Sequence, residues 1–218
     1  WMNVVVKSEL ITRSFSNNNQ PSKAIIGLHG WKGNEFVFEQ FAKIVNLDNA
    51  HWYFPRAPYQ SESGEGFTWF HGSDEKGWEY EKTISGLTNL LKKINSHGFT
   101  NKDIYFIGFS QGACLALEFA LRLPYAIGGI IPIAGFIKFK EKVESEGTKE
   151  SKRTPVLLFH GNQDEVIPVS ASITSHSILK RRKNPVFLKT YDAAHKIPIK
   201  IAPIIREFIL DTKDFNLV

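Results

Sequence analysis

A single serine, Ser110, lies between two glycines in the run "IYFIGFSQGACLALEFA". The apolar residues before the serine predict a strand, and the residues after it have helical spacing. Gly108 and Gly112 complete the pattern G-x-S-x-G, in which small flanking residues permit a sharp turn between strand and helix. Such a turn exposes the serine hydroxyl, so the sequence predicts that Ser110 is a nucleophile.

A serine hydroxyl attacks well only when a base removes its proton and an acid orients that base. The run "VLLFHGNQDEVIP" ends an apolar strand in a polar turn that carries Asp164, with Glu165 as the competing carboxylate. The run "VFLKTYDAAHKIP" places His195 in a short loop after the next strand. Because the carboxyl ends of parallel strands meet at one edge of a sheet, we expect Asp164 and His195 near Ser110. Serine, aspartate and histidine in this chain order are typical of the α/β-hydrolase fold.

Two backbone N–H groups are predicted to bind the oxyanion that forms when a carbonyl is attacked. The first belongs to Gln111, at the start of the helix after the serine, where the helix dipole favours negative charge. The second belongs to Trp31 in "AIIGLHGWKGNEF", where Gly30 permits a close approach of the backbone.

Other histidines and the cysteine compete for these roles. His29 and His160 each end a predicted strand directly before a glycine, which indicates a structural role in a turn. His71, in "WFHGSDEKGW", is a candidate for the border of a pocket. Cys114 is expected to be buried and unreactive, because serine and not cysteine occupies the turn that exposes a nucleophile.

Short apolar runs alternate with longer stretches of helical spacing, as in strand–helix–strand crossover units. We predict an α/β fold: one domain over residues 1–218, with a mostly parallel, doubly wound sheet, an antiparallel start and helices on both faces. The polar stretch 138–154 is predicted to be a surface excursion, with a lid over the site as the alternative. The predicted strands are Asn3–Ser8, Leu10–Phe15, Ala24–Leu28, Trp52–Phe54, Ile104–Phe109, Gly129–Ile133, Val156–His160 and Val186–Tyr191. The predicted helices are Glu35–Val45, Trp78–Asn95, Gln111–Arg122, Val169–Arg182 and Lys196–Leu210.

Seven runs together resemble the phospholipase/carboxylesterase family of α/β-hydrolases, which includes bacterial carboxylesterases and acyl-protein thioesterases: "GLHGWKGNEF", "FPRAPYQ", "GFTWF", "IGFSQGACLALEFAL", "IPIAGFI", "LLFHGNQDEVIP" and "DAAHKIP". The resemblance covers nearly the whole chain, from about residue 24 to about residue 208. It implies a catalytic triad of Ser110, Asp164 and His195, with Trp31 and Gln111 as amide donors. It also implies that the reaction needs neither a metal nor a cofactor.

The implied activity is hydrolysis of a small-molecule acyl ester or thioester through an acyl-enzyme intermediate. We expect a carboxylesterase for short-to-medium acyl chains, because family members often have an aliphatic residue where this chain has Trp31, and the indole is expected to narrow or roof the acyl site. The alternatives are an acyl-protein thioesterase or lysophospholipase, and a hydrolase fold that binds without catalysis. Trp69, Phe70 and Phe136 match family positions near the acyl pocket, although each equally fits a buried core position.

Composition excludes several other classes of protein. The net charge of +5 comes from 27 basic and 22 acidic residues spread along the chain, which argues against a nucleic-acid-binding protein. The basic run 180–183 is expected to complement the negative end of its helix.

One cysteine in the chain favours the cytoplasm, and no apolar run is long enough for membrane insertion. A homodimer is compatible with this interpretation, and Trp1, ahead of Met2, is interpreted as a cloning remnant.

Overall fold

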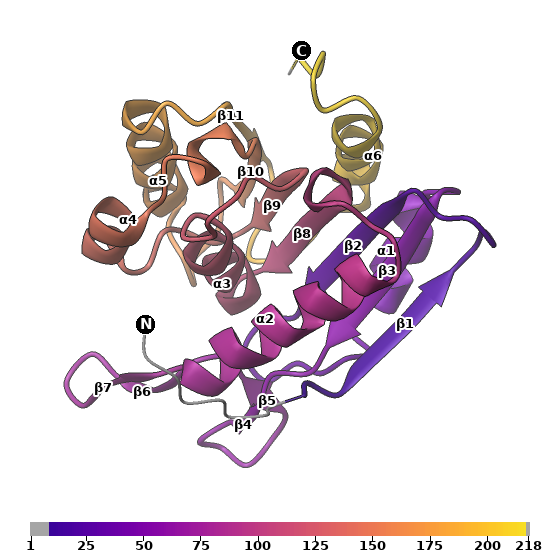
Figure 1. Cartoon of the computed structure of the whole chain (residues 1–218). Helices are drawn as coiled ribbons and strands as arrows, with labels where there is room; N and C mark the ends of the chain where they lie inside the picture. The colour runs from indigo at the N-terminus through magenta and orange to yellow at the C-terminus, as the bar shows by residue number, and fades with distance from the viewer. Residues whose placement is uncertain (1–8, 217–218) are drawn as a thin grey trace.

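Seven strands form the central sheet of the computed structural model, which describes residues 9–216 (Figure 1). The first strand pairs antiparallel with its neighbour, and every other pair in this sheet is parallel. The predicted mostly parallel sheet with an antiparallel start is therefore confirmed, whereas the strand predicted at residues 3–8 and the remnant at residue 1 lie outside the described residues. In spatial order the strands are β1 (Thr12–Ser16), β3 (Ala50–Pro55), β2 (Lys23–Leu28), β8 (Ile104–Phe109), β9 (Gly129–Ile133), β10 (Val156–Gly161) and β11 (Val186–Tyr191).

Helices cover both faces of this sheet, as predicted for a doubly wound fold (Figure 1). Alternate strand residues point to opposite faces, so Ile26 packs with one set of helices and Ile25 with the other. The helices α2 (Glu81–Ser96), α3 (Gln111–Ala120), α4 (Lys140–Glu146) and α5 (Val169–Arg181) contribute to the first apolar cluster. The helices α1 (Glu39–Val45) and α6 (Ala202–Leu210) contribute to the second. None of the helices in residues 9–216 is long and apolar enough to cross a membrane.

Two small hairpins lie between β3 and α2, where the sequence predicts loop and the first turn of a helix. One pairs β4 (Tyr59–Gln60) with β5 (Phe67–Thr68), and the other pairs β6 (His71–Ser73) with β7 (Gly77–Glu79). The predicted helix from Trp78 is therefore wrong at its start. Gly72 and Gly77 adopt φ angles of 111° and 83°, which only glycine adopts readily, and they allow the chain to reverse before the helix begins.

The polar stretch 138–154 is not a simple surface excursion. It contains α4 and a short 3₁₀ helix (Ser151–Arg153), and Val143 and Ser151 are buried. The Ser151 hydroxyl donates to the carbonyl of Leu121 at 2.6 Å, and Arg182 donates to the carbonyl of Val143 at 3.1 Å. The composition of the stretch does not reveal these hydrogen bonds, because Leu121 and Arg182 lie outside it.

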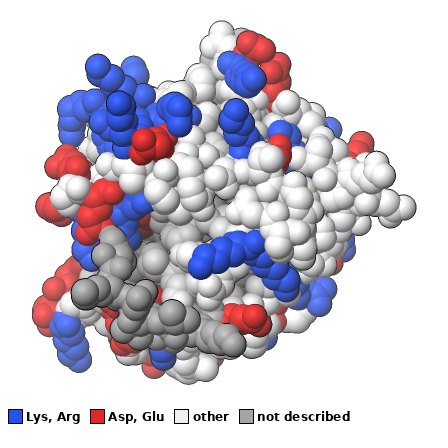
Figure 2. Space-filling model, in the orientation of Figure 1, with Lys and Arg blue, Asp and Glu red and all other residues white. Residues whose placement is uncertain are grey.

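Basic side chains gather where α5 ends, at the upper left of Figure 2, which shares the orientation of Figure 1. Lys180, Arg181 and Lys183 of the run 180–183 are exposed, and they lie at the negative end of the helix. Arg182 differs from its neighbours, because it is half-buried and donates hydrogen bonds to the carbonyl of Val143 on α4 and to the hydroxyl of Ser151. Its burial lowers the pKa of the guanidinium from its ordinary value.

One buried acid, Glu118 on α3, anchors the residue that precedes α4. Its Oε1 accepts the backbone N–H of Phe139 at 2.7 Å, and its Oε2 has no hydrogen-bond partner within residues 9–216. Burial raises the pKa of Glu118 to about 7, against the opposing effects of the Phe139 N–H and of the positive charges on Arg122 and Lys142. The folded protein therefore holds the carboxyl in its protonated form to a higher pH than an exposed glutamate.

Glu118→Gln is expected to stabilise the protein at pH 8 and to change its stability much less at pH 5. A carboxyl whose folded pKa lies above its unfolded value contributes most stability at low pH, and that contribution is lost as the pH rises through both values. A rise from an ordinary pKa to about 7 corresponds to roughly 3 kcal/mol between pH 4 and pH 8. Thermal unfolding of both proteins at the two pH values measures the effect, with exposed Glu144→Gln as the matched control. Equal Tm differences at pH 5 and pH 8 would contradict the assignment.

Candidate active site

Ser110 lies at the sharp turn between β8 and α3, with φ 53° and ψ −118°. A positive φ is strained for serine, and the turn is held by the Ser110 N–H, which donates to the carbonyl of Ile133 at 2.9 Å. Gly108 and Gly112 are required because a side chain at either position would clash with the backbone. A Cβ on Gly112 would lie 2.2 Å from the carbonyl oxygen of Leu28, and one on Gly108 would lie 2.3 Å from the carbonyl oxygen of Gly112.

The structure brings Ser110, His195 and Asp164 into one chain of hydrogen bonds. His195 Nε2 lies 3.0 Å from Ser110 Oγ, and His195 Nδ1 lies 2.7 Å from Asp164 Oδ2. Ser110 follows β8, Asp164 follows β10 and His195 follows β11, so the parallel sheet brings them to one edge, as the sequence predicts. The ring of Phe109 packs against His195 with centroids 4.8 Å apart and limits the freedom of the imidazole.

The carboxylate of Asp164 is buried and fully engaged. Its Oδ1 accepts the backbone N–H groups of Val166 at 2.9 Å and Ile167 at 2.8 Å, while Oδ2 faces His195. Burial acts to raise the pKa of Asp164, but the hydrogen bonds from His195, Ile167 and Val166 and the nearby imidazole outweigh it, so the pKa lies below its ordinary value. The competing carboxylate, Glu165, is exposed to solvent. Of the two acids, only Asp164 touches the imidazole.

The two predicted oxyanion donors lie beside the serine. Trp31 and Lys32 form a tight turn closed by the Gly33 N–H, which donates to the carbonyl of Gly30 at 3.0 Å, and Lys32 takes a φ of 62°. A Cβ on Gly30 would lie 3.5 Å from Ser110 Cβ, so this turn packs directly on the nucleophile. In the described part of the chain, the backbone N–H groups of Trp31 and Gln111 make no hydrogen bond. Both can therefore donate to a ligand.

The side chain of Gln111 has a role that the sequence analysis missed. Its Oε1 accepts the Trp69 backbone N–H at 2.9 Å, and its Nε2 donates to Thr68 Oγ1 at 2.8 Å. The indole of Trp69 is fully buried and donates to the carbonyl of His29 at 2.8 Å. Trp69 therefore belongs to the core and does not line the cleft, which corrects its assignment as a pocket residue. The glutamine at position 111, next to the serine, is the sequence feature that could have indicated the hydrogen bonds to Thr68 and Trp69.

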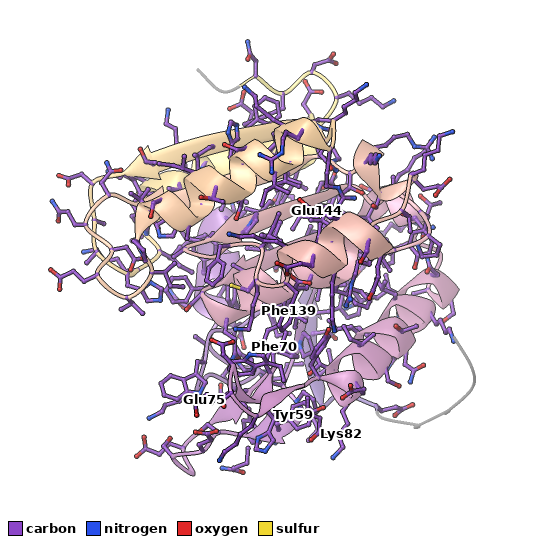
Figure 3. The ribbon with its side chains drawn as sticks, turned by 90° about the vertical axis from the view of Figure 1, so that its left-hand side faces the viewer. Tyr59, Phe70, Glu75, Lys82, Phe139 and Glu144 are labelled. Carbon is purple, nitrogen blue, oxygen red and sulfur yellow. The ribbon has the colours of Figure 1, made fainter. Side chains whose placement is uncertain are left out.

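A cleft of about 250 Å³ opens next to the serine turn. Phe70, which was predicted to be a pocket residue, lies on this cleft, and so does the exposed His71. Figure 3 shows Phe70 beside Phe139, whose ring lies 6.0 Å from it. Phe136 is half-buried and is not among the residues that line this cleft, and its N–H contacts Cys114 Sγ at 3.5 Å. Its assignment to an acyl pocket stays a prediction. The side chains on the cleft include Trp31, Thr68, Phe70, His71, Trp78 and Gln111.

Cys114 and His29 are unsuited to chemistry at this site. Cys114 is buried on α3, and burial raises the pKa of its thiol to about 12. Burial also lowers the pKa of His29 to about 4, so its imidazole is neutral at physiological pH. His29 Nε2 accepts the backbone N–H of Ala57 at 3.1 Å, which agrees with the structural role expected for a histidine at a strand end.

Comparisons with known proteins find relatives among carboxylesterases and acyl-protein thioesterases. Acyl-protein thioesterase 1 of Kluyveromyces lactis is 31% identical over 167 residues, which cover 69% of this chain and 73% of that protein. Carboxylesterase SOBER1 of Arabidopsis thaliana is 26% identical over 202 residues, which cover 85% and 88% of the two chains. A probable inactive carboxylesterase of Oryza sativa is 25% identical over 189 residues, which cover 78% and 76%.

Solved structures show the same fold. The crystal structure of esterase PE8 superposes with a TM-score of 0.81 at 26% identity, and the match covers 93% of this chain and 99% of that one. The crystal structure of SOBER1 from Arabidopsis thaliana superposes with a TM-score of 0.75 at 24% identity and covers 86% and 97%. The model of the phospholipase/carboxylesterase family matches residues 12–212. The fold is thus confirmed, and the chain belongs to the phospholipase/carboxylesterase family of α/β-hydrolases.

Proposed function

We propose that this protein is a carboxylesterase-type serine hydrolase with Ser110, His195 and Asp164 as its catalytic triad. The observation that carries the proposal is the unbroken chain of hydrogen bonds through these side chains, at 3.0 Å and 2.7 Å. Family membership alone is a weaker argument, because one relative is named as probably inactive. The intact chain of hydrogen bonds argues against the non-catalytic alternative.

The proposed reaction proceeds in two steps. His195 Nε2 takes the Ser110 proton as Oγ attacks the acyl carbonyl, and the amides of Trp31 and Gln111 bind the oxyanion. His195 then gives the proton to the leaving alcohol or thiol, and Asp164 stabilises the charged imidazole in between. Water, activated by His195, attacks the acyl-enzyme by the same route and releases the acid.

The cleft beside Ser110 supports a substrate with a short-to-medium acyl chain. A cavity of about 150 Å³ holds a benzene ring in another protein. A cleft of about 250 Å³ therefore has room for a chain of modest length. The thioesterase or lysophospholipase alternative stays open, because a thioesterase is among the relatives. Rates of hydrolysis over matched series of acyl esters and thioesters, from two to sixteen carbons, separate these readings.

Trp31→Leu is expected to shift the kcat/KM optimum toward longer acyl chains. The indole is more than half exposed and forms one side of the cleft, so its removal widens the space beside the serine. The backbone N–H remains, and turnover of the shortest ester should change little. In the parent protein we expect an optimum at roughly two to eight carbons, since each lost or clashing methylene is worth about 1–3 kcal/mol.

The matched control is Phe36→Leu, because Phe36 is equally exposed on the same loop but is not on the cleft. This variant should keep the parent's chain-length profile. An optimum at palmitoyl length in the parent, or identical profiles for Trp31→Leu and the parent, would show that the indole does not limit the acyl site.

We also propose that the chain is one hydrolase domain that acts in the cytoplasm on small-molecule substrates. The single cysteine supports a reducing compartment. The 27 basic residues are opposed by 22 acidic ones, and acidic side chains lie among the basic ones on the face in Figure 2, which argues against nucleic acid as a partner. A homodimer stays a prediction, which size-exclusion chromatography with light scattering tests directly.

A further inference from the structure

A second histidine, His160, lies against the carboxylate of the proposed triad. It is the penultimate residue of β10, four residues before Asp164, and its side chain is fully buried. His160 Nε2 is 2.8 Å from the carbonyl oxygen of Ile167 and 3.3 Å from Asp164 Oδ2. A carbonyl only accepts, so Nε2 carries a proton and donates. Asp164 Oδ2 is therefore flanked by two imidazoles, those of His160 and His195.

His160 closes the turn that presents Asp164. The N–H of Ile167 donates to Asp164 Oδ1 at 2.8 Å, while the carbonyl of the same residue accepts from His160. Both the backbone N–H and the backbone carbonyl of Ile167 are therefore hydrogen-bonded. Without His160, the Ile167 carbonyl loses its partner and the turn is free to rotate the carboxylate away from His195. A buried acceptor without a donor costs free energy, so the turn has reason to move.

The other ring nitrogen ties His160 to the serine turn. His160 Nδ1 is 2.6 Å from Ser172 Oγ, which lies 2.8 Å from the carbonyl oxygen of Gly135. Gly135 packs on the serine turn, because a Cβ at this position would lie 3.1 Å from the carbonyl oxygen of Ser110. One buried imidazole thereby connects the loop that carries the acid with the loop that supports the nucleophile.

We propose that His160 is a positioning residue for catalysis, which sets the orientation of Asp164 toward His195; this inference rests on the proposed serine hydrolase function. Misplacement of a catalytic group by about 1 Å lowers a rate by roughly 10²-fold. Loss of the His160 contact with Ile167 and Asp164 should therefore lower kcat and leave KM nearly unchanged, since His160 is buried away from the cleft.

Two variants separate the contacts of the two ring nitrogens of His160. In His160→Gln, the longer side chain reaches the position of Nε2 and keeps a donor for Ile167. In His160→Asn, the amide stands near Nδ1 and keeps only the contact with Ser172. We expect His160→Asn to lower kcat about 10²-fold. We expect His160→Gln to retain most of the rate, a rescue that depends on the retained donor.

The low-field proton NMR signal of His195 Nδ1–H, which donates to Asp164, gives a readout that a general loss of stability does not move. It should shift or vanish in His160→Asn and stay in His160→Gln. The matched control is His29→Asn, which changes a buried histidine directly after β2 and should leave the signal in place.

Wild-type kcat together with an unshifted signal in a folded His160→Asn would overturn the proposal. If that variant does not fold, Ser172→Ala removes one hydroxyl from the same network, and an unchanged rate and signal there would overturn it equally. Failure of the proposed function has a different signature, because Ser110→Ala would then keep the activity of the parent.

Discussion

Ser110→Ala is expected to lower kcat for the best ester by about 10⁶-fold, because the members of a serine triad act as a unit. Without the hydroxyl no acyl-enzyme forms, and only the amide donors and substrate binding remain to favour hydrolysis. The substitution removes one atom from a half-buried side chain, so the fold should persist. Initial rates of ester hydrolysis measure the loss, and circular dichroism checks the fold.

The matched control is Ser177→Ala, which removes an exposed hydroxyl on α5 that donates to the carbonyl of Ile173. It should retain the parent's rate. A Ser110→Ala protein with more than a hundredth of the parent's activity would require another nucleophile. Cys114 is a poor substitute, since burial raises the pKa of its thiol to about 12.

Asp164→Asn is expected to lower kcat by about 10⁴-fold, because an amide at this position favours the wrong tautomer of the catalytic histidine. His195 Nδ1 lies 2.7 Å from Asp164 Oδ2, so the geometry can remain while the proton sits on the wrong nitrogen. The loss should appear in kcat and not in KM. Steady-state kinetics with one short ester are sufficient to measure it.

Glu165→Gln is the matched control for the acid. This neighbouring side chain is exposed, so its amide should leave kcat within a few-fold of the parent. The opposite ranking of the two variants would mean that the exposed carboxylate turns inward in the working enzyme and serves as the acid. Equal and small effects in both would remove the acid from the mechanism.

The strands of the sheet were predicted well because their pattern is local. The strands at 104–109 and 129–133 agree in both bounds, since apolar runs are typical of buried parallel strands. The strand at 186–191 also agrees in both bounds, although it lies at the edge of the sheet and most of its residues are half-buried. The helix starts were predicted less well. The helix expected from Lys196 begins as a 3₁₀ turn at Ile199, because Pro198 keeps the residue before it out of the helical conformation.

Long-range pairing explains the other error in a helix start. The helix expected from Glu35 begins at Glu39, because Glu35 is buried and bound by Arg56, whose Nε donates to Glu35 Oε2 at 2.7 Å. An ion pair between residues 21 positions apart leaves no periodic signal in the sequence. Glu35 therefore belongs to the loop before the helix and not to the helix itself.

In the site too, features that depend on nearby sequence were predicted, and features that depend on contacts between distant residues were not. Ser110, Asp164 and His195 were placed correctly because each follows a recognisable strand, and parallel strands deliver such residues to one edge. A structural role for His160 in a turn was expected, but its contacts with Asp164 and Ile167 were not. The roles of Glu118 and the Gln111 side chain were missed, because each depends on a partner from a distant segment. Trp69 was misassigned for the same reason: its bond to the His29 carbonyl exists only after folding.

Covalent labelling of the nucleophile tests the central claim most directly. A fluorophosphonate reacts with a serine that a neighbouring base activates, and His195 Nε2 lies 3.0 Å from Ser110 Oγ. Intact mass spectrometry should show one label per chain, and peptide mapping should place it on Ser110. The Ser110→Ala protein should remain unlabelled. No label on the folded parent, or a label that persists in Ser110→Ala, would contradict the assignment of Ser110 as the catalytic nucleophile.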